Sequence, residues 1–301
     1  MTLALIAGQG GVPPHLVKSL LARGEVPLIC EMAQFPSEVT GDLPRLGFRL
    51  ESFGNFLAEL RARGITRLCM AGAMRRPAVD PSLIDAATAP YIPRLQGALA
   101  KGDDGLLREI IAIFETSGIE VIGAAGIAPD LLPEPGLRIG GLPDGIAADL
   151  AAAVAALDQM GRDDLGQAVV VRAGRVVARE DERGTDAMLA DLTKDGDSGG
   201  GWSLDPFDIA DQMIGGAADW LSGQDSPTET GGLLYKAPKP GQDLRADMPV
   251  IGPDTARRVV AAGLDGIVIE AGGVMLLEPE DVRGVLAVAG LFLWVRPGGT
   301  G

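Results

Sequence analysis

Histidine, cysteine and aromatic residues are scarce in this 301-residue chain. The single histidine, His15, excludes a multi-histidine metal site, and it argues against a Ser-His-Asp triad because His15 would have to be the base. Two cysteines, Cys30 and Cys69, are too few for a disulfide framework or a thiolate zinc site. Each lies in an apolar run, which predicts a reduced core residue.

Basic residues are also in deficit. The chain has 26 Lys and Arg against 41 Asp and Glu, a net charge of −15, which lacks the basic footprint that nucleic-acid binding needs. Thirteen acidic and only two basic residues fall between 180 and 230, so most of the acidity belongs to one segment. We interpret residues 195–232, which are also rich in Gly and Ser, as a loop or insertion. The net charge therefore does not exclude an anionic substrate.

Long apolar runs are absent. The longest, residues 285–295, suits a core strand or helix but not a bilayer span. The chain starts directly with a strand-like apolar run at 3–7 and no basic stretch, which predicts no signal peptide. We therefore expect a cytoplasmic protein.

The first part of the chain alternates short apolar runs with amphipathic stretches, which is typical of a parallel α/β sheet. It predicts a Rossmann-like N-terminal domain over residues 1–130. The expected strands are 3–7, 26–30, 65–72 and 119–124, and the expected helices are 15–24, 53–64 and 106–118.

The proline- and glycine-rich segment 131–145 is the predicted linker. A second, mixed α/β domain is expected over 146–301. In residues 167–181 two β-branched runs flank Ala173-Gly174, which predicts a hairpin. The other expected elements of this domain are helices 146–159 and 255–262 and strands 266–272 and 290–295.

A glycine turn follows the first strand and precedes a helix, so its amide groups could approach a phosphate. Glu31 lies 23 residues after the first glycine and loosely imitates the acid of a dinucleotide fingerprint, although Pro13 replaces the third glycine. An NAD-type oxidoreductase is therefore one alternative, and a tight turn without a ligand is another. The turn consists of Gly8, Gln9, Gly10 and Gly11.

The most unusual segment is KAPKPGQDLRADMP at 236–249, in which prolines and a glycine prevent an ordinary helix. Its cations, Lys236, Lys239 and Arg245, could hold phosphate oxygens. Its carboxylates, Asp243 and Asp247, could bind Mg²⁺, or one of them could orient water. A solvated loop with incidental charge pairs explains the same composition equally well.

Two shorter signals are weaker. Thr185 and Asp186 follow the predicted hairpin, and as a local pattern they predict a helix N-cap, although a hydroxyl beside a carboxylate could also bind phosphate or a metal. Arg76 follows the strand expected at 65–72, where ligands bind in α/β sheets, so it could meet an anion. A solvated turn is an equal alternative for Arg76.

Taken together and in order, these segments resemble the UDP-2,3-diacylglucosamine pyrophosphatase LpxI family of lipid A biosynthesis. The pattern KPGQDLRxDxPxxGxxT is the most specific of them, and the resemblance spans nearly the whole chain. The matching stretches are LALIAGQGGVPPHLV, CMAGAMRRP, KGDDGLLREI, LGQAVVVRAGRVVARE, GTDAML, KAPKPGQDLRADMPVIGPDT and GIVIEAGGVMLLE.

The resemblance implies a cytoplasmic hydrolase that depends on Mg²⁺, with Mn²⁺ as a second candidate. It would cleave the pyrophosphate of UDP-2,3-diacylglucosamine to lipid X (2,3-diacylglucosamine 1-phosphate) and UMP. The resemblance further implies two α/β domains with the site between them, a homodimer, and peripheral contact with the inner membrane. A nucleotide-sugar or lipid binding protein without catalytic activity is the non-enzyme alternative.

The resemblance also implies roles for the residues of the matching motifs. Asp243 would be the essential carboxylate, through metal binding or water activation, with Asp247 as its partner. Gln9, Arg76, Thr185 and Asp186 become substrate-binding residues, and Gly8, Gly10 and Gly11 would face the nucleotide or a sugar phosphate. The residues that would hold the pyrophosphate are Lys239, Gln242 and Arg245.

Overall fold

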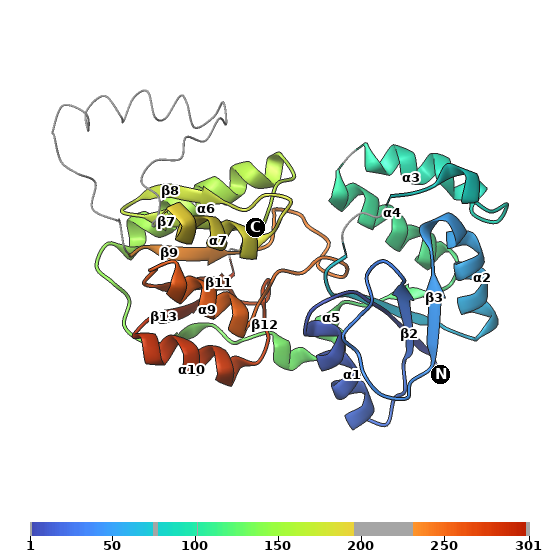
Figure 1. Ribbon diagram of the computed structural model, residues 1–301, viewed down its shortest axis with the longest axis horizontal. Helices are drawn as coiled ribbons and strands as arrows, with labels where there is room; N and C mark the ends of the chain where they lie inside the picture. The colour runs from blue at the N-terminus through green and yellow to red at the C-terminus, as the bar shows by residue number, and fades with distance from the viewer. Residues whose placement is uncertain (1, 75–77, 101, 196–230, 299–301) are drawn as a thin grey trace.

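The protein has two α/β lobes that lie side by side (Figure 1). The computed structural model describes residues 2–74, 78–100, 102–195 and 231–298. Among these residues, no helix combines the length and the apolar character that crossing a bilayer demands.

The first lobe is built on a five-stranded sheet in which every strand pair is parallel, in the order β3-β2-β1-β4-β5. This confirms the Rossmann-like parallel sheet. Sequence patterning missed β3, because this edge strand is only four residues long and is half exposed. The strands are β1 (Leu3–Ala7), β2 (Leu28–Met32), β3 (Arg45–Phe48), β4 (Arg67–Ala71) and β5 (Glu120–Val121).

Helices cover both faces of this sheet, so its central strands are buried on both sides. Successive side chains of β1 therefore point to opposite faces of the sheet. Leu5 packs in the core formed with α1 and α5, and Ile6 packs in the core formed with α2 and α4. The helices are α1 (Val12–Ala22), α2 (Phe53–Ala62), α3 (Ile92–Leu99), α4 (Asp103–Thr116) and α5 (Ala124–Ile127).

The two cysteines lie in cores on opposite faces of this sheet, and both are fully buried free thiols. Burial raises the pKa of Cys30 and of Cys69 to about 12, so neither forms a thiolate at neutral pH. We expect a thiol-specific reagent such as DTNB to label neither cysteine in the native protein at pH 8 and both in denaturant. Rapid labelling of either thiol in the folded protein would contradict this placement.

The second lobe is built on a six-stranded mixed sheet in the order β6-β13-β11-β9-β7-β8. β9, β11 and β13 are parallel to one another, and the remaining pairs are antiparallel. The strands are β6 (Gly136–Ile139), β7 (Ala168–Arg172), β8 (Arg175–Arg179), β9 (Leu233–Lys236), β11 (Gly266–Glu270) and β13 (Phe292–Arg296).

The predicted hairpin is confirmed. β7 and β8 pair antiparallel, and they are joined at Ala173 (φ 48°) and Gly174 (φ 77°). Positive φ at both central residues matches the right-handed twist of the flanking strands. Gly174 accepts this conformation without strain, whereas Ala173 adopts it less readily.

Helices again cover both faces of the second sheet. α6 (Ile146–Arg162) packs on one face, and α7 (Thr185–Asp195), α9 (Pro253–Ala261) and α10 (Pro279–Ala289) pack on the other. The apolar run at 285–295 is therefore not one element. It is divided at Gly290, whose φ of 72° ends α10 before β13 begins.

Part of the segment predicted as a linker belongs to this sheet. β6 pairs antiparallel with β13 at the sheet edge, so residues 136–139 are a strand of the second lobe. Gly136 is the first residue of this short strand, and the other prolines and glycines that suggested a linker flank it.

A small two-stranded ribbon joins the lobes. It consists of β10 (Val250–Ile251) and β12 (Met275–Leu276), which are parallel. Met275 is buried in the core of the first lobe, and Met248 and Leu277 pack against that core. Figure 1 shows the segment after β9 crossing from the second lobe toward the first. Second-lobe residues thus form part of the first lobe's core beside the site described next.

Candidate active site between the lobes

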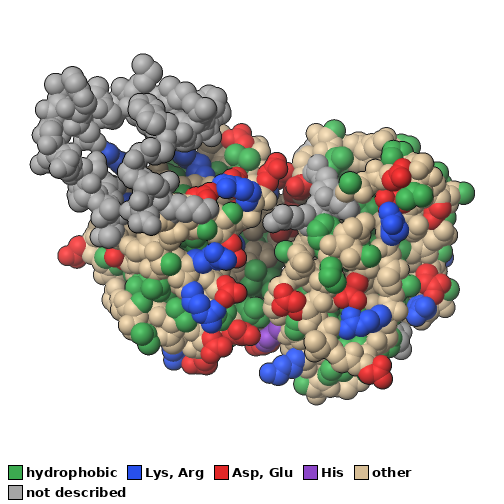
Figure 2. Space-filling view, in the orientation of Figure 1, with side chains coloured by type: hydrophobic (Ala, Val, Ile, Leu, Met, Phe, Trp, Pro, Cys, Tyr) green, Lys and Arg blue, Asp and Glu red, His purple; other side chains and the backbone are tan. Residues whose placement is uncertain are grey.

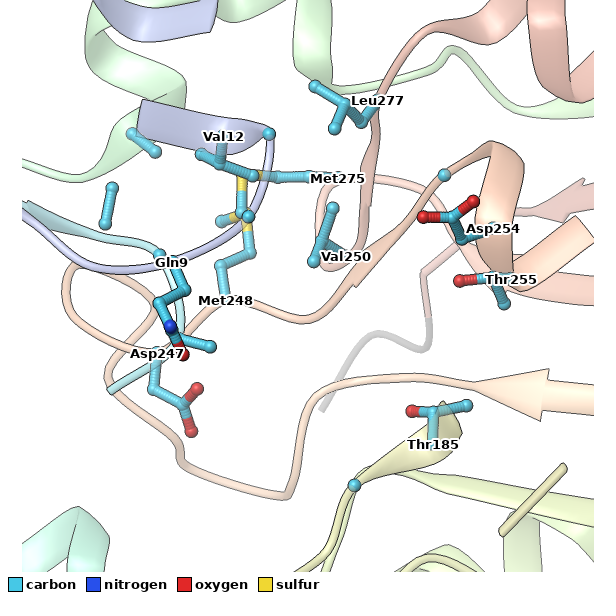
Figure 3. A pocket seen from close by; sticks show the side chains of 18 of the residues that line it. Gln9, Val12, Thr185, Asp247, Met248, Val250, Asp254, Thr255, Met275 and Leu277 are labelled. Atoms are coloured by element: carbon cyan, nitrogen blue, oxygen red, sulfur yellow. The ribbon is translucent and has the colours of Figure 1, made fainter. Parts of the chain in front are cut away.

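A cavity of about 770 Å³ lies between the lobes. Its walls come from the glycine turn of the first lobe and, in the second lobe, from the end of β9, the starts of α7 and α9, and residues 244–248 and 250. Figure 2 shows the surface hollowed between the two lobes, and Figure 3 shows the lining side chains. The cavity is large enough for a sizeable ligand.

Three helices begin at this cavity. α1 and α9 start after Gly11 and Gly252, neither of which provides a side-chain cap, and α7 starts at Thr185. The first amide groups of a helix have no acceptor within the helix and carry partial positive charge. Helix starts of this kind favour anionic ligands.

Thr185 connects a buried cation to a carboxylate. Its hydroxyl accepts a hydrogen bond from Lys236 Nζ (2.7 Å) and donates to Glu180 Oε1 (2.8 Å). All three residues line the cavity. The N-cap prediction for Thr185 is therefore wrong, because Thr185 is the first residue inside α7 and its hydroxyl bonds to side chains.

Asp186 also lines the cavity, in the first turn of α7. Its Oδ1 lies 3.3 Å from Arg258 Nε in the last turn of α9, so this carboxylate links the start of α7 to α9. It is the other residue of the predicted Thr-Asp pair, and both members therefore reach the site.

Asp247 is the second carboxylate of the KPGQDLRxDxP motif (the KPGQD motif), and it borders the cavity. Its Oδ2 accepts hydrogen bonds from Gln167 Nε2 (2.8 Å) and Gln242 Nε2 (2.6 Å). Burial raises the pKa of Asp247, and the charge of Lys239 opposes that shift. Figure 3 places Asp247 and Gln9 on one side of the cavity and Thr185 on another.

Asp243 is not among the cavity-lining residues. Its carboxylate accepts from Arg245 Nε (3.0 Å) and Arg245 Nη2 (2.7 Å), and this guanidinium lowers the pKa of Asp243. Arg245 lines the cavity and also reaches across to Glu115 of α4, with Nη1 2.6 Å from Oε1. Asp243 thus acts on the cavity, in this arrangement, through Arg245.

Lys239 and Gln242 do not line the cavity and instead contact residues next to it. Lys239 Nζ forms an ion pair with Asp164 (2.6 Å), and the Gln242 amide holds Asp247. Arg76 lies outside the described residues, as does most of the acidic segment 195–232.

The glycine turn has a different role for each residue. Gly8 is buried, and its N–H donates to Ala71 O (2.8 Å). Of the four residues of the turn, only Gln9, Gly10 and Gly11 line the cavity. A Cβ on Gly8 would lie 2.7 Å from Ala73 O, so close backbone approach explains this glycine.

The Gly10 amide already has an acidic partner that sequence patterning did not single out. Gly10 N donates to Glu38 Oε1 (3.2 Å), and Glu38 lines the cavity. Glu31, the acid of the NAD-type alternative, is instead bonded to Ser37 and Arg45 and does not line the cavity. Glu31, which would bind a ribose in a dinucleotide site, therefore forms its hydrogen bonds outside the cavity.

One wall of the cavity is apolar. It is formed by side chains from α1, from the ribbon that joins the lobes and from residues next to that ribbon, and Figure 3 shows them gathered away from Thr185. A wall of this type suits a hydrocarbon part of a ligand. Its residues are Val12, Met248, Val250, Met275 and Leu277.

The predicted metal ligands do not form a ligand set in this arrangement. Within the described residues, no group of three or more His, Cys, Asp or Glu side chains is placed to hold a metal ion. Both Asp243 oxygens accept from Arg245, and burial favours the neutral form of Asp247, whereas a metal ligand must be ionised.

Fold and site together define a two-lobed α/β protein in which three helices begin at a cavity between the lobes. Comparison with known proteins gives the family. Residues 2–131 match the LpxI N-terminal domain and residues 141–294 match the LpxI C-terminal domain, so the chain belongs to the LpxI family.

One relative is a curated protein named UDP-2,3-diacylglucosamine pyrophosphatase LpxI, from Caulobacter vibrioides. It is 33% identical over 293 residues, which are 97% of this chain and 96% of the relative. Among solved structures, a UDP-glucose 4-epimerase of Thermus thermophilus in complex with NAD aligns over 99% of this chain and 86% of that one. Its identity of 18% and TM-score of 0.30 are too low to bear on fold or ligand.

Proposed function

We propose that this protein hydrolyses the pyrophosphate bond of UDP-2,3-diacylglucosamine, releasing UMP and lipid X in lipid A biosynthesis. The activity is that of the relative's name, and membership of the LpxI family supports it. The observation that carries the proposal is the double character of the interlobe cavity. Helix starts and buried Lys236 offer positive charge at one part, and methionine and leucine side chains form an apolar wall at another.

This double character matches an acylated nucleotide-sugar diphosphate. Hydrolysis of a pyrophosphate requires neutralisation of the phosphoryl oxygens and a water molecule oriented in line with the leaving group. Lys236, Arg245 and the helix amides can provide the first, and a carboxylate of the KPGQD motif the second. This chemistry requires neither a histidine nor a thiol, in agreement with the single histidine and the two buried cysteines.

The proposal is tested by incubating the purified protein with UDP-2,3-diacylglucosamine and identifying the products by mass spectrometry. We expect UMP and lipid X in equal amounts. Release of UDP instead would overturn the assignment of the cleaved bond. Tight binding of the substrate without turnover would favour the non-catalytic binding protein, and stoichiometric NAD binding would favour the oxidoreductase.

Mg²⁺ dependence, with Mn²⁺ as a substitute, is a further part of the proposal. When bound, a divalent cation would neutralise phosphoryl oxygens. The motif suggests Asp243 and Asp247 as its ligands, and they could hold it only after Asp243 leaves Arg245 and Asp247 is ionised. We expect turnover to fall by at least about 10²-fold in EDTA and to return when Mg²⁺ or Mn²⁺ is added. Equal rates in EDTA and in Mg²⁺ would remove the metal from the mechanism.

We also propose that the protein is a cytoplasmic homodimer. We further propose that it contacts the inner membrane peripherally, because the substrate carries two acyl chains. Light scattering of the purified protein measures the oligomeric state. Flotation with liposomes, with and without substrate, measures the membrane contact.

A further inference from the structure

Lys236 is a buried cation with no ion pair among the described residues. It ends β9 in the middle of the second sheet, opposite Ala168 of β7 and Ile269 of β11. Its side chain is 7% exposed, and its ammonium donates to the Thr185 hydroxyl. Lys239, three residues further on, has the counter-ion that Lys236 lacks, because it is paired with Asp164.

The nearest carboxylates form no direct ion pair with this ammonium: Glu180 is connected to it through Thr185, and Asp247 interacts with its charge without contact. A buried ammonium without a direct counter-ion is costly, because the protein does not replace the water that solvates the charge. Lys236 borders the cavity, so a bound anion can supply the missing charge. The ammonium has three donors, and one of them is used on Thr185. The carboxyl end of a strand is also where α/β sheets bind ligands.

Thr185 and Glu180 hold the ammonium in place. Glu180 Oε2 accepts from Gln167 N (2.7 Å), which fixes this carboxylate, and its Oε1 takes the Thr185 hydroxyl proton. The Thr185 oxygen is therefore left to accept from Lys236. Glu180 and Thr185 act as positioning residues for Lys236, at the point where the first amides of α7 reach the same cavity.

The first-lobe end of the cavity has the opposite character. Glu38 accepts from the Gly10 amide at the start of α1, and this carboxylate has no ion pair among the described residues. Its neighbours hold the backbone at this position, because Ser37 is bonded to Glu31 and Val39 is buried, while the Glu38 side chain itself is exposed. A carboxylate on this amide occupies the place a phosphate would take and repels other anions.

We infer that one phosphoryl group of the ligand binds at the second-lobe end of the cavity, against Lys236 Nζ and the first amides of α7, and not at the glycine turn. The identity of the ligand rests on the proposed function. The chemical class is a phosphate ester of a nucleoside or of a hexosamine, and the subsite is the same for either.

Calorimetric titration of paired ligands tests this inference. The pairs are UMP with uridine, and N-acetylglucosamine 1-phosphate with N-acetylglucosamine. In Lys236→Met we expect the phosphorylated member of at least one pair to bind about tenfold more weakly or worse, and the unphosphorylated members to bind as in the wild type. The affected pair shows whether the nucleotide or the sugar supplies the phosphate. Lys18→Met, an exposed lysine on α1, is the matched control and should change nothing.

Unchanged affinity of Lys236→Met for both phosphorylated ligands would overturn the subsite. Tighter phosphate binding by Glu38→Gln, with Lys236→Met unaffected, would place the phosphate at the glycine turn instead. Thr185→Val keeps the Lys236 ammonium but removes its hydrogen-bond partner, so this variant should also weaken phosphate binding and can replace Lys236→Met if that variant fails to fold. Thr185→Ser keeps the hydroxyl and should restore phosphate binding. These titrations involve no turnover, so a wild type that binds phosphate through Lys236 but releases no UMP would refute the proposed function alone.

Discussion

Asp243→Ala is expected to lower kcat by about 10²- to 10⁴-fold while the substrate still binds. The substitution removes the carboxylate that we propose for orienting water or a metal ion, and it frees the Arg245 guanidinium that this carboxylate holds in the cavity wall. UMP release under saturating substrate measures kcat, and equilibrium titration with the substrate measures binding.

Two further variants sharpen that experiment. Asp243→Asn keeps the size of the side chain but removes its charge, so it should lose nearly as much activity as the alanine variant. Asp158→Ala removes an exposed acidic side chain on α6, far from the motif in sequence, and should behave as the wild type. Wild-type rates of UMP release by Asp243→Ala would refute the catalytic assignment and leave the family assignment intact.

Gly8→Ala is expected to lower the free energy of unfolding by about 1–3 kcal/mol. The added Cβ would lie 2.7 Å from Ala73 O and 2.8 Å from Gly72 C and O, and these backbone atoms cannot move aside as a flexible side chain could. The strain falls at the first turn after β1, so the cavity-lining residues that follow should shift as well. Urea denaturation followed by circular dichroism measures the loss.

A glycine-to-alanine substitution at another position should change the free energy of unfolding in the opposite direction. Gly284 lies within α10, and a Cβ there would meet no atom within 4 Å outside its own helix backbone. Gly284→Ala should therefore raise the free energy of unfolding by about 0.5–1 kcal/mol, because alanine loses less backbone entropy in a helix. Equal stability of the two variants would show that the close approach at Gly8 is not what requires glycine there.

The sequence predicted the elements whose pattern is local. The buried strands β1 and β4 are continuous apolar runs, and the β7–β8 hairpin has turn residues between β-branched runs, so both were predictable. β9 was missed because its four residues directly follow the Gly-rich segment and have no alternation. The short ribbon strands β10 and β12 exist only because they pair with each other and pack on the other lobe.

The candidate site was predictable in its motifs but not in its pairings. The motif around Asp247 could be recognised, whereas the partners of its carboxylate, Gln167 and Gln242, include a contact 80 residues apart in the chain. Likewise Thr185 resembled a helix cap until the structure brought it to Lys236, 51 residues away. Phosphate at the glycine turn was a reasonable expectation from the turn alone. It could not take account of Glu38, which lies 28 residues further along the chain than Gly10.

The buried position of Met275 has a consequence for how this architecture can evolve. A second-lobe side chain that fills the first lobe's core makes each half a partner in the folding of the other. Exchanging one half for that of an unrelated α/β protein would leave a cavity in the core of the first lobe or an exposed apolar ribbon on the second lobe. We therefore expect the two halves to have evolved as one unit.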